Sequence, residues 1–402
     1  MRLVELWLQP RRLAWVAALC CGLTVAGVLV MVLLSHGLIL PNKRIVGGDF
    51  LAFWSAGRLV LEGRIAEVHA AQALLQIHHQ VAPGLEVVYL WHHPPTFLLV
   101  AVALASLPYL VAMAVWLLST GLLWAMAVRA FTPDPRVLLI AFAAPGVVMH
   151  LGNAQTGLLF AAICGFALMW LDRRPLAAGA MIGLFVLKPH LAVLFPVALA
   201  TSGRWRTFWM AAVCVLAVCG AAYIAFGPGS FMAFLHNLRA AEAVVTDQRV
   251  SAQTYVSLYG NLIGLGAPEL LASCLHWGSA GAATGYVWRL WRRGDGDFAM
   301  VGLVAGSLLI SPYLFFYDLT LLLVAGAFLV RAVGWDGLTT WEKLAVVLAW
   351  AAPGLTLLVG NVVSAPIGAV SCWLLLWIAM RRSGNFRTSG IEAPAPVPTP
   401  QP

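Results

Sequence analysis

The segment that decides the fold begins with Gly47-Gly48-Asp49-Phe50, continues through Phe53-Trp54-Ser55-Ala56-Gly57-Arg58 and ends with Trp91-His92-His93-Pro94-Pro95. It carries four carboxylates, two arginines and five of the ten histidines, and it is the one long polar interruption in the N-terminal half of an apolar chain. Hydrocarbon cannot satisfy polar backbone or charged groups, so such a segment must lie in water or against protein. We therefore expect the rest of the chain to form a scaffold around this loop.

The composition is that of a membrane protein. Of the 402 residues, 61% are hydrophobic and 10% are charged, and the mean hydropathy is +0.88. Soluble domains carry about 25% charged residues, which excludes a single water-soluble core. We predict an all-α polytopic integral membrane protein whose partner is the lipid bilayer. Basic loops facing anionic lipid account for the net charge of +8, so no nucleic-acid partner is expected.

Apolar run lengths predict about twelve transmembrane helices. The basic start Met1–Arg12 precedes an apolar run too long for a cleaved signal peptide, so we interpret that run as a retained first span. The segment 96–108 is either a full span or a half-helix, and we prefer the half-helix because so short a segment cannot cross. Amphipathic helices near 50–62 and 70–81 are expected to lie in the plane of the outer interface. The expected spans are 13–38, 110–129, 137–150, 156–171, 175–188, 190–203, 207–226, 269–290, 298–311, 318–333, 343–358 and 364–381.

The distribution of charge predicts the orientation. With these spans, 17 of the 24 Lys and Arg residues lie on one side, which the positive-inside rule assigns to the cytoplasm together with both termini. We expect one transmembrane domain over 1–389 with outer loops 41–109 and 227–267, followed by a disordered Pro-rich cytoplasmic tail over 390–402. All ten histidines fall on the outer side. A site is therefore expected on the periplasmic face of a bacterial inner membrane.

The polar groups on this outer face suit one kind of chemistry. The chain has no Walker loop, no Gly-rich dinucleotide turn and no serine nucleophile elbow. Charged residues are scarce in mid-span, which argues against an ion pathway. A carboxylate with nearby cations suits transfer of a sugar from a lipid phosphate, with Asp49 as the candidate base for the acceptor hydroxyl. The leaving phosphate needs stabilising charge, which Lys188, Arg58 and the histidines can supply.

Several motifs are similar to those of a known family. Asp49-Phe50 followed by Phe53-Trp54-x-Ala-Gly resembles the first-loop signature of glycosyltransferase family eighty-seven. The resemblance implies a GT-C fold, a polyprenyl-phosphate-sugar donor and Asp49 as the catalytic base. Four further motifs match in order: His93-Pro94-Pro95, Gly152-Asn153-Ala154-Gln155, the run from Gly179 through Gly183 to Lys188-Pro189-His190, and Ser311-Pro312.

Two departures from the family pattern limit what the resemblance implies. Asn153 and Ala154 split the family's Gly-Gln turn. The late turn of the family usually carries Trp and His, whereas this chain has Phe315-Phe316-Tyr317-Asp318. Contact between a histidine of that turn and the donor phosphate is therefore not carried over.

Together these observations predict an inverting glycosyltransferase that moves a sugar, mannose first among the candidates, from a polyprenyl-phosphate donor to a glycolipid or glycan acceptor. Asp49 is the expected general base, and neither a metal nor another cofactor is expected. The rivals are a lipid-linked sugar transporter or flippase, for which the inverted repeats are not seen, and a non-catalytic assembly subunit. The expected donor-phosphate residues are Lys188, His190 and Arg58, and the expected substrate contacts are Trp54, His93, Asn153, Gln155, Tyr317 and Asp318.

Structural interpretations of the same residues stay open. Asp49 and Asp318 could each cap the helix that follows, because Asp favours the N-cap position. Lys188 could extend to the interface as a snorkelling side chain, and Arg58 could contact lipid headgroups. Adjacent histidines point apart on a helix and so do not form a metal site together. We therefore expect the pairs His78-His79 and His92-His93 to be solvated at the interface and not to bind a metal.

Overall fold

The computed structural model describes residues 5, 8–246, 256–360 and 365–388 and confirms the all-α class. Within these residues the only extended pairing consists of two isolated bridges, one between His36 and Ile39 and one between Ile39 and Ile45. The expected tail 390–402 lies outside the described residues. The helices are α2 (Pro10–Leu33), α3 (Phe50–Leu61), η1 (Ile65–Glu67), α4 (Ala71–Val81), α5 (Pro95–Ala105), α6 (Tyr109–Phe131), α7 (Pro135–Phe142), α8 (Pro145–Asn153), α9 (Gly157–Trp170), α10 (Pro175–Gly183), η2 (Leu184–Leu187), η3 (Pro189–Leu191), α11 (Phe195–Thr201), α12 (Trp205–Thr246), α13 (Leu258–Gly264), α14 (Glu269–Arg293), α15 (Asp297–Ile310), η4 (Phe316–Leu321), α16 (Leu322–Val333), α17 (Thr340–Gly360) and α18 (Ile367–Thr388).

Fewer helices than expected have the length and hydropathy of a full span. Five pass both criteria in the described part of the chain, and α7 with α8 makes a sixth if that pair, bent by 55°, counts as one span. Other expected spans correspond to short apolar helices such as α9 and α15. A short apolar helix enclosed by protein has the same local sequence pattern as a span, so sequence periodicity does not separate the two. The chain is a multi-pass membrane protein by these helices.

Proline determines where several helices begin. The first residue of a helix needs no N–H donor, and the fixed φ of proline suits that position. In the described part of the chain, five α-helices and the 3-10 helix η3 begin this way, at Pro10, Pro95, Pro135, Pro145, Pro175 and Pro189.

The half-helix is confirmed, and two neighbouring predictions need correction. α5 ends at Ala105 after 11 residues, and α6 follows as a single long helix. The expected span 190–203 is wrong, because the chain there forms η3 and the seven-residue α11. The expected span 207–226 does not end at a loop: α12 continues past a break at Gly227, where φ is +71° ahead of Pro228.

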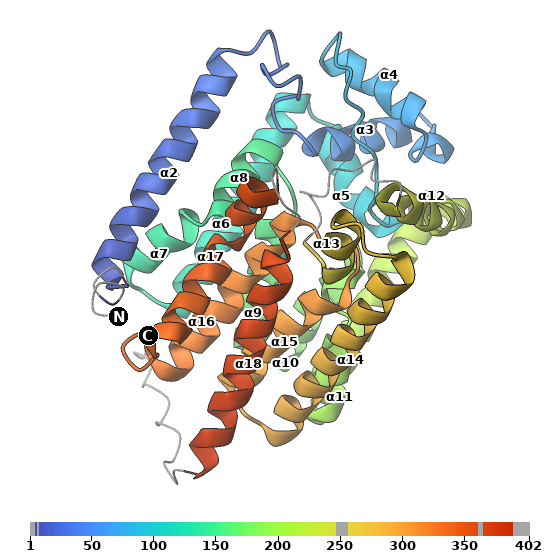
Figure 1. The fold of residues 1–402 in the computed structure, drawn as a ribbon. Helices are drawn as coiled ribbons and strands as arrows, with labels where there is room; N and C mark the ends of the chain where they lie inside the picture. The colour runs from blue at the N-terminus through green and yellow to red at the C-terminus, as the bar shows by residue number, and fades with distance from the viewer. Residues whose placement is uncertain (1–4, 6–7, 247–255, 361–364, 389–402) are drawn as a thin grey trace, which may run out of the picture.

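The two helices expected in the interface plane differ in their surroundings. α4 is amphipathic as predicted, with Leu74 and Ile77 buried and Gln72 and Gln80 exposed. α3 is not amphipathic in this sense, because its residues are buried on every side from Phe50 to Gly57. Figure 1 shows α3, α4 and α5 together with part of α12 at one end of the helical bundle, away from the two termini. Protein, and not the lipid interface, therefore surrounds α3.

Gly57 allows α3 to lie against α5. A Cβ at this position would lie 2.6 Å from the carbonyl carbon of Ala101 and 2.6 Å from the Cβ of Ala105. We predict that Gly57→Ala destabilises the protein by about 1–3 kcal/mol, because backbone cannot move aside as a flexible side chain can. Thermal unfolding in detergent measures the effect.

The control for this substitution is Gly121→Ala in α6, where an added Cβ meets nothing within 4 Å. Alanine favours the helix at such a site by up to about 1 kcal/mol, so Gly121→Ala should unfold at the same temperature or higher. Equal melting temperatures for the two variants would contradict the close packing of α3 on α5.

Candidate active site

Asp49 lies directly before α3, at the end of the loop that follows α2. The residue is half-buried, with protein around most of it. Gly48 turns the chain there with φ of +43°, and an added Cβ would lie 2.9 Å from Oδ1 of Asn153. The Asp49 loop therefore packs closely against the end of α8.

Gln155 holds the Asp49 carboxylate. Its Nε2 donates to Oδ2 of Asp49 at 2.8 Å, and its Oε1 accepts from the backbone N–H of Thr156 at 3.1 Å. Because that N–H can only donate, the amide has one orientation, with its NH₂ group toward Asp49. Asp49 occupies the N-cap position of α3 but makes no capping hydrogen bond. The capping interpretation is therefore wrong, and the carboxylate faces a residue 106 positions away in sequence.

The surroundings raise the pKa of Asp49 above its ordinary value. Burial is the main cause because it disfavours the charged form. The hydrogen bond from Gln155 and the positive charges of Arg44 and Lys188 act in the opposite direction. A carboxylate with a raised pKa is a stronger base than an ordinary aspartate.

Lys188 is buried and paired, not extended toward the interface. It follows η2, and 4% of its surface is exposed. Its Nζ forms an ion pair with Asp318 and donates to Oγ1 of Thr156 at 3.4 Å. The ammonium also lies 4.6 Å from the centre of the Tyr317 ring, within the range of a cation–π interaction. The snorkelling interpretation is wrong, because the ammonium is buried and its polar partners, Asp318 and Thr156, are buried as well.

Asp318 is not the N-cap residue that the sequence left open, because it lies inside η4 as the third residue after the N-cap Phe315. Its side chain is fully buried. Oδ2 accepts from the backbone N–H of Phe315 at 3.2 Å, as a cap would, and lies 3.8 Å from Nε2 of His190. Oδ1 pairs with Lys188. One carboxylate thus pairs with Lys188 and lies near His190, and both of these side chains were expected to contact phosphate.

The turn Gln155–Thr156 connects the two halves of this arrangement. Gln155 bonds to Asp49, and the next residue, Thr156, bonds to Lys188. We refer to residues 154–156 as the linking turn. Sequence analysis missed Thr156, because a single threonine after a motif residue carries no recognisable pattern.

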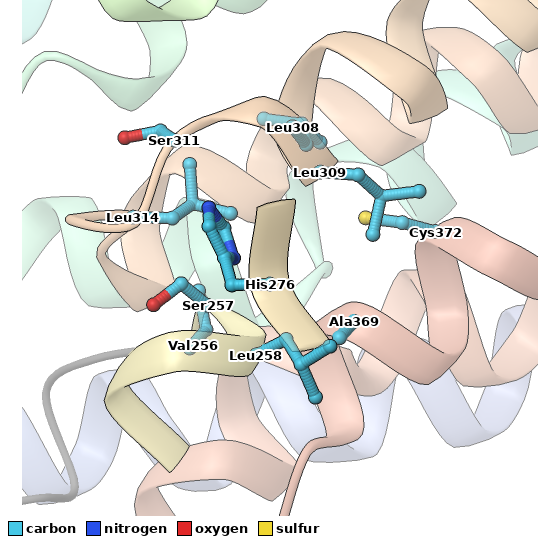
Figure 2. Close-up of a pocket in the computed structure, with 10 residues that line it drawn as sticks. All are labelled: Val256, Ser257, Leu258, His276, Leu308, Leu309, Ser311, Leu314, Ala369 and Cys372. Atoms are coloured by element: carbon cyan, nitrogen blue, oxygen red, sulfur yellow. The ribbon is translucent and has the colours of Figure 1, made fainter. Parts of the chain in front are cut away.

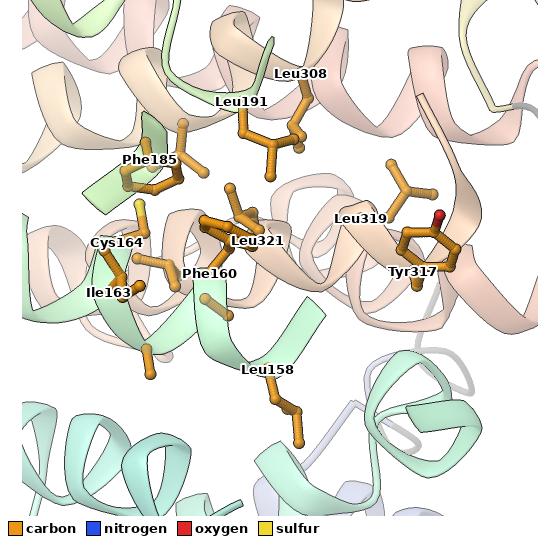
Figure 3. Close-up of a cluster of buried hydrophobic side chains, with 14 of the residues drawn as sticks. Leu158, Phe160, Ile163, Cys164, Phe185, Leu191, Leu308, Tyr317, Leu319 and Leu321 are labelled. Carbon is orange, nitrogen blue, oxygen red and sulfur yellow. The ribbon is translucent and has the colours of Figure 1, made fainter. Parts of the chain in front are cut away.

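Contacts behind the late turn keep Asp318 in place. Val256 donates its N–H to the carbonyl of Leu314 at 2.9 Å, and the hydroxyl of Ser257 bonds to the carbonyl of Pro312. Val256, Ser257 and Leu314 line the small pocket in Figure 2, which is too small to hold a ligand. Figure 3 shows Tyr317 at the edge of a buried apolar cluster that includes Leu158 and Phe160 of α9. The late turn is therefore packed from both sides.

Arg58 and Trp54 lie elsewhere on α3. Arg58 is nine residues beyond Asp49, which is about 13 Å along a helix axis. Its guanidinium lies 3.8 Å from Glu62 and 5.6 Å from the centre of the Trp54 ring. Trp54 is buried and donates its indole N–H to the carbonyl of Leu107 at 2.9 Å. These contacts are structural, and they do not bring either side chain to the Lys188 side of the site.

His93 lies on the Lys188 side within a cluster of aromatic rings. It stacks on Phe97 with ring centres 4.5 Å apart and meets Phe53 edge-on at 5.1 Å. Burial, followed by the positive charge of Lys188, holds the pKa of His93 well below its usual range. The imidazole is therefore neutral at pH 7 and can donate or accept a hydrogen bond but adds no charge.

Comparison with known proteins gives the family. Residues 91–312, more than half of the chain, match the sequence model of glycosyltransferase family 87. The chain belongs to glycosyltransferase family 87. No curated protein sequence and no solved structure matches this chain.

Family membership assigns transfer of a sugar to this membrane protein, and the match covers one side of the site. Gln155, Lys188 and His190 lie within the matched residues, as do His93 and Asn153. Asp49 and Asp318 lie outside them, so the geometry alone connects these two carboxylates to the matched region. This glycosyltransferase therefore has its candidate base and its buried cation joined through matched residues of the linking turn.

We predict that Lys188→Met destabilises the glycosyltransferase by about 3–5 kcal/mol, because it leaves the Asp318 charge buried without its partner. Combining Lys188→Met with Asp318→Asn should restore most of this loss, since no charge is then left unpaired. Denaturant unfolding of the purified variants gives the comparison.

The exposed ion pair between Lys43 and Glu86, at 3.8 Å, offers a matched control. Lys43→Met removes the same charge with the same side-chain replacement but should change stability little, because water screens the pair. If Lys188→Met is as stable as Lys43→Met, the buried ion pair between Lys188 and Asp318 does not make the predicted contribution to stability.

Proposed function

We propose that this protein is an inverting glycosyltransferase that moves a sugar, mannose first among the candidates, from a polyprenyl-phosphate donor to a glycolipid or glycan acceptor. The observation that carries the proposal is the pairing of a half-buried carboxylate with a buried lysine through one turn of the chain. Such a site offers a base for a hydroxyl and a fixed positive charge for a phosphate.

The reaction follows from the positions of these groups. Gln155 occupies Oδ2 of Asp49, which leaves Oδ1 to accept the proton of the acceptor hydroxyl. The hydroxyl oxygen attacks the anomeric carbon from the side opposite the phosphate while the bond from that carbon to the phosphate oxygen breaks. The sugar therefore inverts, and the lipid phosphate leaves with the bonding electron pair.

The leaving phosphate gains charge, so it needs cations that are already in place. Asp318 and Thr156 hold Lys188 before any substrate binds, and His190 lies 3.8 Å from the Asp318 carboxylate. A preformed charge of this kind needs no rearrangement as the reaction proceeds. Tyr317, His93 and Asn153 border the same region and are the proposed substrate contacts.

The remaining features of the proposal concern the membrane. We place Asp49 on the outer face of a bacterial inner membrane with both termini in the cytoplasm, in a GT-C architecture of about twelve membrane segments. The excess of Lys and Arg on the opposite side supports this orientation. Short helices such as α9 and α10 count as segments in that total although they are too short to cross alone.

The direct test uses purified protein in nanodiscs with radiolabelled polyprenyl-phosphate-mannose and a membrane lipid extract, with and without EDTA. We expect wild type to transfer label to a new lipid or glycan in both conditions and Asp49→Asn to lose at least 100-fold in rate, as expected for removal of a general base. Asp336→Asn, at an exposed loop position, is the control and should transfer as wild type does.

Each other outcome has a separate meaning. Full activity of Asp49→Asn would refute the base assignment. Loss of activity in EDTA would refute the metal-independent mechanism. Movement of the labelled donor across the bilayer without any new product would favour the transporter instead.

The dependence of rate on pH gives a second test. Asp49 must be deprotonated to act as a base, and burial raises its pKa, so kcat/KM should fall on the acid side at a pH above the ordinary aspartate pKa. Gln155→Ala removes a hydrogen bond that lowers this pKa, so the acid limb should move to still higher pH. If Gln155→Ala leaves the acid side of the pH profile at the same pH, the ionisation of Asp49 does not control kcat/KM.

A further inference from the structure

The linking turn has a backbone conformation that other contacts must maintain. Ala154 ends α8 in the left-handed region, with φ of +47° and ψ of +41°. A residue with a Cβ pays a steric cost there, so the conformation persists only where neighbouring groups impose it. The residue that follows is Gln155, so the direction of its side chain depends on this turn.

Trp116 of α6 forms a hydrogen bond to the linking turn. Its indole N–H donates to the carbonyl oxygen of Ala154 at 2.8 Å, and both groups are buried. The peptide unit is planar, so holding this carbonyl also sets the position of the Gln155 nitrogen. α6 is the long helix Tyr109–Phe131, which makes it a rigid support.

A second contact joins α6 to the last turn of α8. The hydroxyl of Thr120 donates to the carbonyl of Trp116 at 2.7 Å and lies 3.1 Å from Nε2 of His150. A hydroxyl has one proton, so Nε2 of His150 must be the donor in the second bond. The carbonyl of His150 in turn accepts from the N–H of Ala154 at 2.7 Å. α6 thus holds Ala154 directly and also through His150.

We infer that Trp116 is a positioning residue of the transferase: by binding the carbonyl of Ala154, it sets the linking turn so that Gln155 meets Asp49 and Thr156 meets Lys188. Trp116 contacts neither reacting group itself. Its effect on both halves of the site passes through two consecutive residues of one turn. This inference rests on the proposed function only for its catalytic consequence, because the geometry of the turn stands by itself.

The matched control lies on the same helix. Trp124 is buried two turns further along α6, yet its indole N–H finds no hydrogen-bond partner among the residues that the structure describes. Trp116→Phe and Trp124→Phe therefore make the same change in volume in the same helix, and only the first removes a hydrogen bond. Phenylalanine also preserves the ring packing of Trp116 against Phe53 and Phe97.

The first measurement is kinetic and uses the full-length protein in nanodiscs with polyprenyl-phosphate-mannose. Trp116→Phe should lower kcat/KM about tenfold, while Trp124→Phe stays within about twofold of wild type. Part of the effect of Trp116 passes through Gln155, so the loss in the double variant Trp116→Phe/Gln155→Ala should be smaller than the product of the two single losses. Multiplicative losses in the double variant would overturn the inference.

The second measurement needs no catalysis. Dicyclohexylcarbodiimide reacts with protonated carboxyl groups, so labelling of Asp49 against pH, read by peptide mass spectrometry, follows its titration. The charged and titratable groups that face Asp49 are Arg44, Lys188 and Tyr89, and none of them changes in these variants. Trp116→Phe should shift the Asp49 labelling curve upward by about one pH unit, because the misplaced Gln155 no longer stabilises the carboxylate.

The two measurements separate the inference from the proposed function. A wild type that transfers no sugar, combined with a shifted labelling curve for Trp116→Phe alone, would refute the proposed function and support the positioning role. An unshifted curve for Trp116→Phe, or an equal shift for Trp124→Phe, would overturn the positioning role whatever the activity. Melting temperatures of both variants report the loss of packing separately.

Discussion

The ion pair between Lys188 and Asp318 is the constraint on which the site depends. Both side chains lie inside an apolar helical protein, where an unpaired charge is costly. Neither residue can move away without leaving the other buried alone, so the late turn and the segment after η2 must stay together. Thr156 and the Tyr317 ring add further contacts to the lysine. The positive charge that a phosphate would need is thus part of the folded core.

The linking turn transmits this constraint to Asp49. It is the point where α8 ends and α9 begins, and its two polar side chains face opposite halves of the site. Irregular backbone at such depth persists only where its polar groups have partners. The indole of Trp116 and the amide of Gln155 supply those partners here. Asp49 and Lys188 therefore hold fixed positions relative to each other through this turn.

Short helices make this arrangement possible. A helix of spanning length carries its backbone hydrogen bonds internally and places few groups at a site. α8, η2, η3 and η4 end or begin within the protein, and each end brings a side chain or a backbone group to the site. The backbone groups at these ends need hydrogen-bond partners inside the protein. Trp116 supplies one for the carbonyl of Ala154, and Asp318 supplies one for the N–H of Phe315. The breaks between these short helices are therefore the places where the residues of the candidate site come together.

The sequence by itself determined the helical class, the half-helix within 96–108 and the amphipathic α4, because these follow from local rules of hydropathy, length and periodicity. It also singled out Asp49, Lys188, Gln155 and Asp318 as separate candidates. Only the tertiary structure decided that these residues meet, since Asp49 and Gln155 are 106 residues apart and Lys188 and Asp318 are 130 apart. It likewise enclosed α3 and left Arg58 at the far end of that helix, because burial depends on which elements pack together and not on the pattern within one of them.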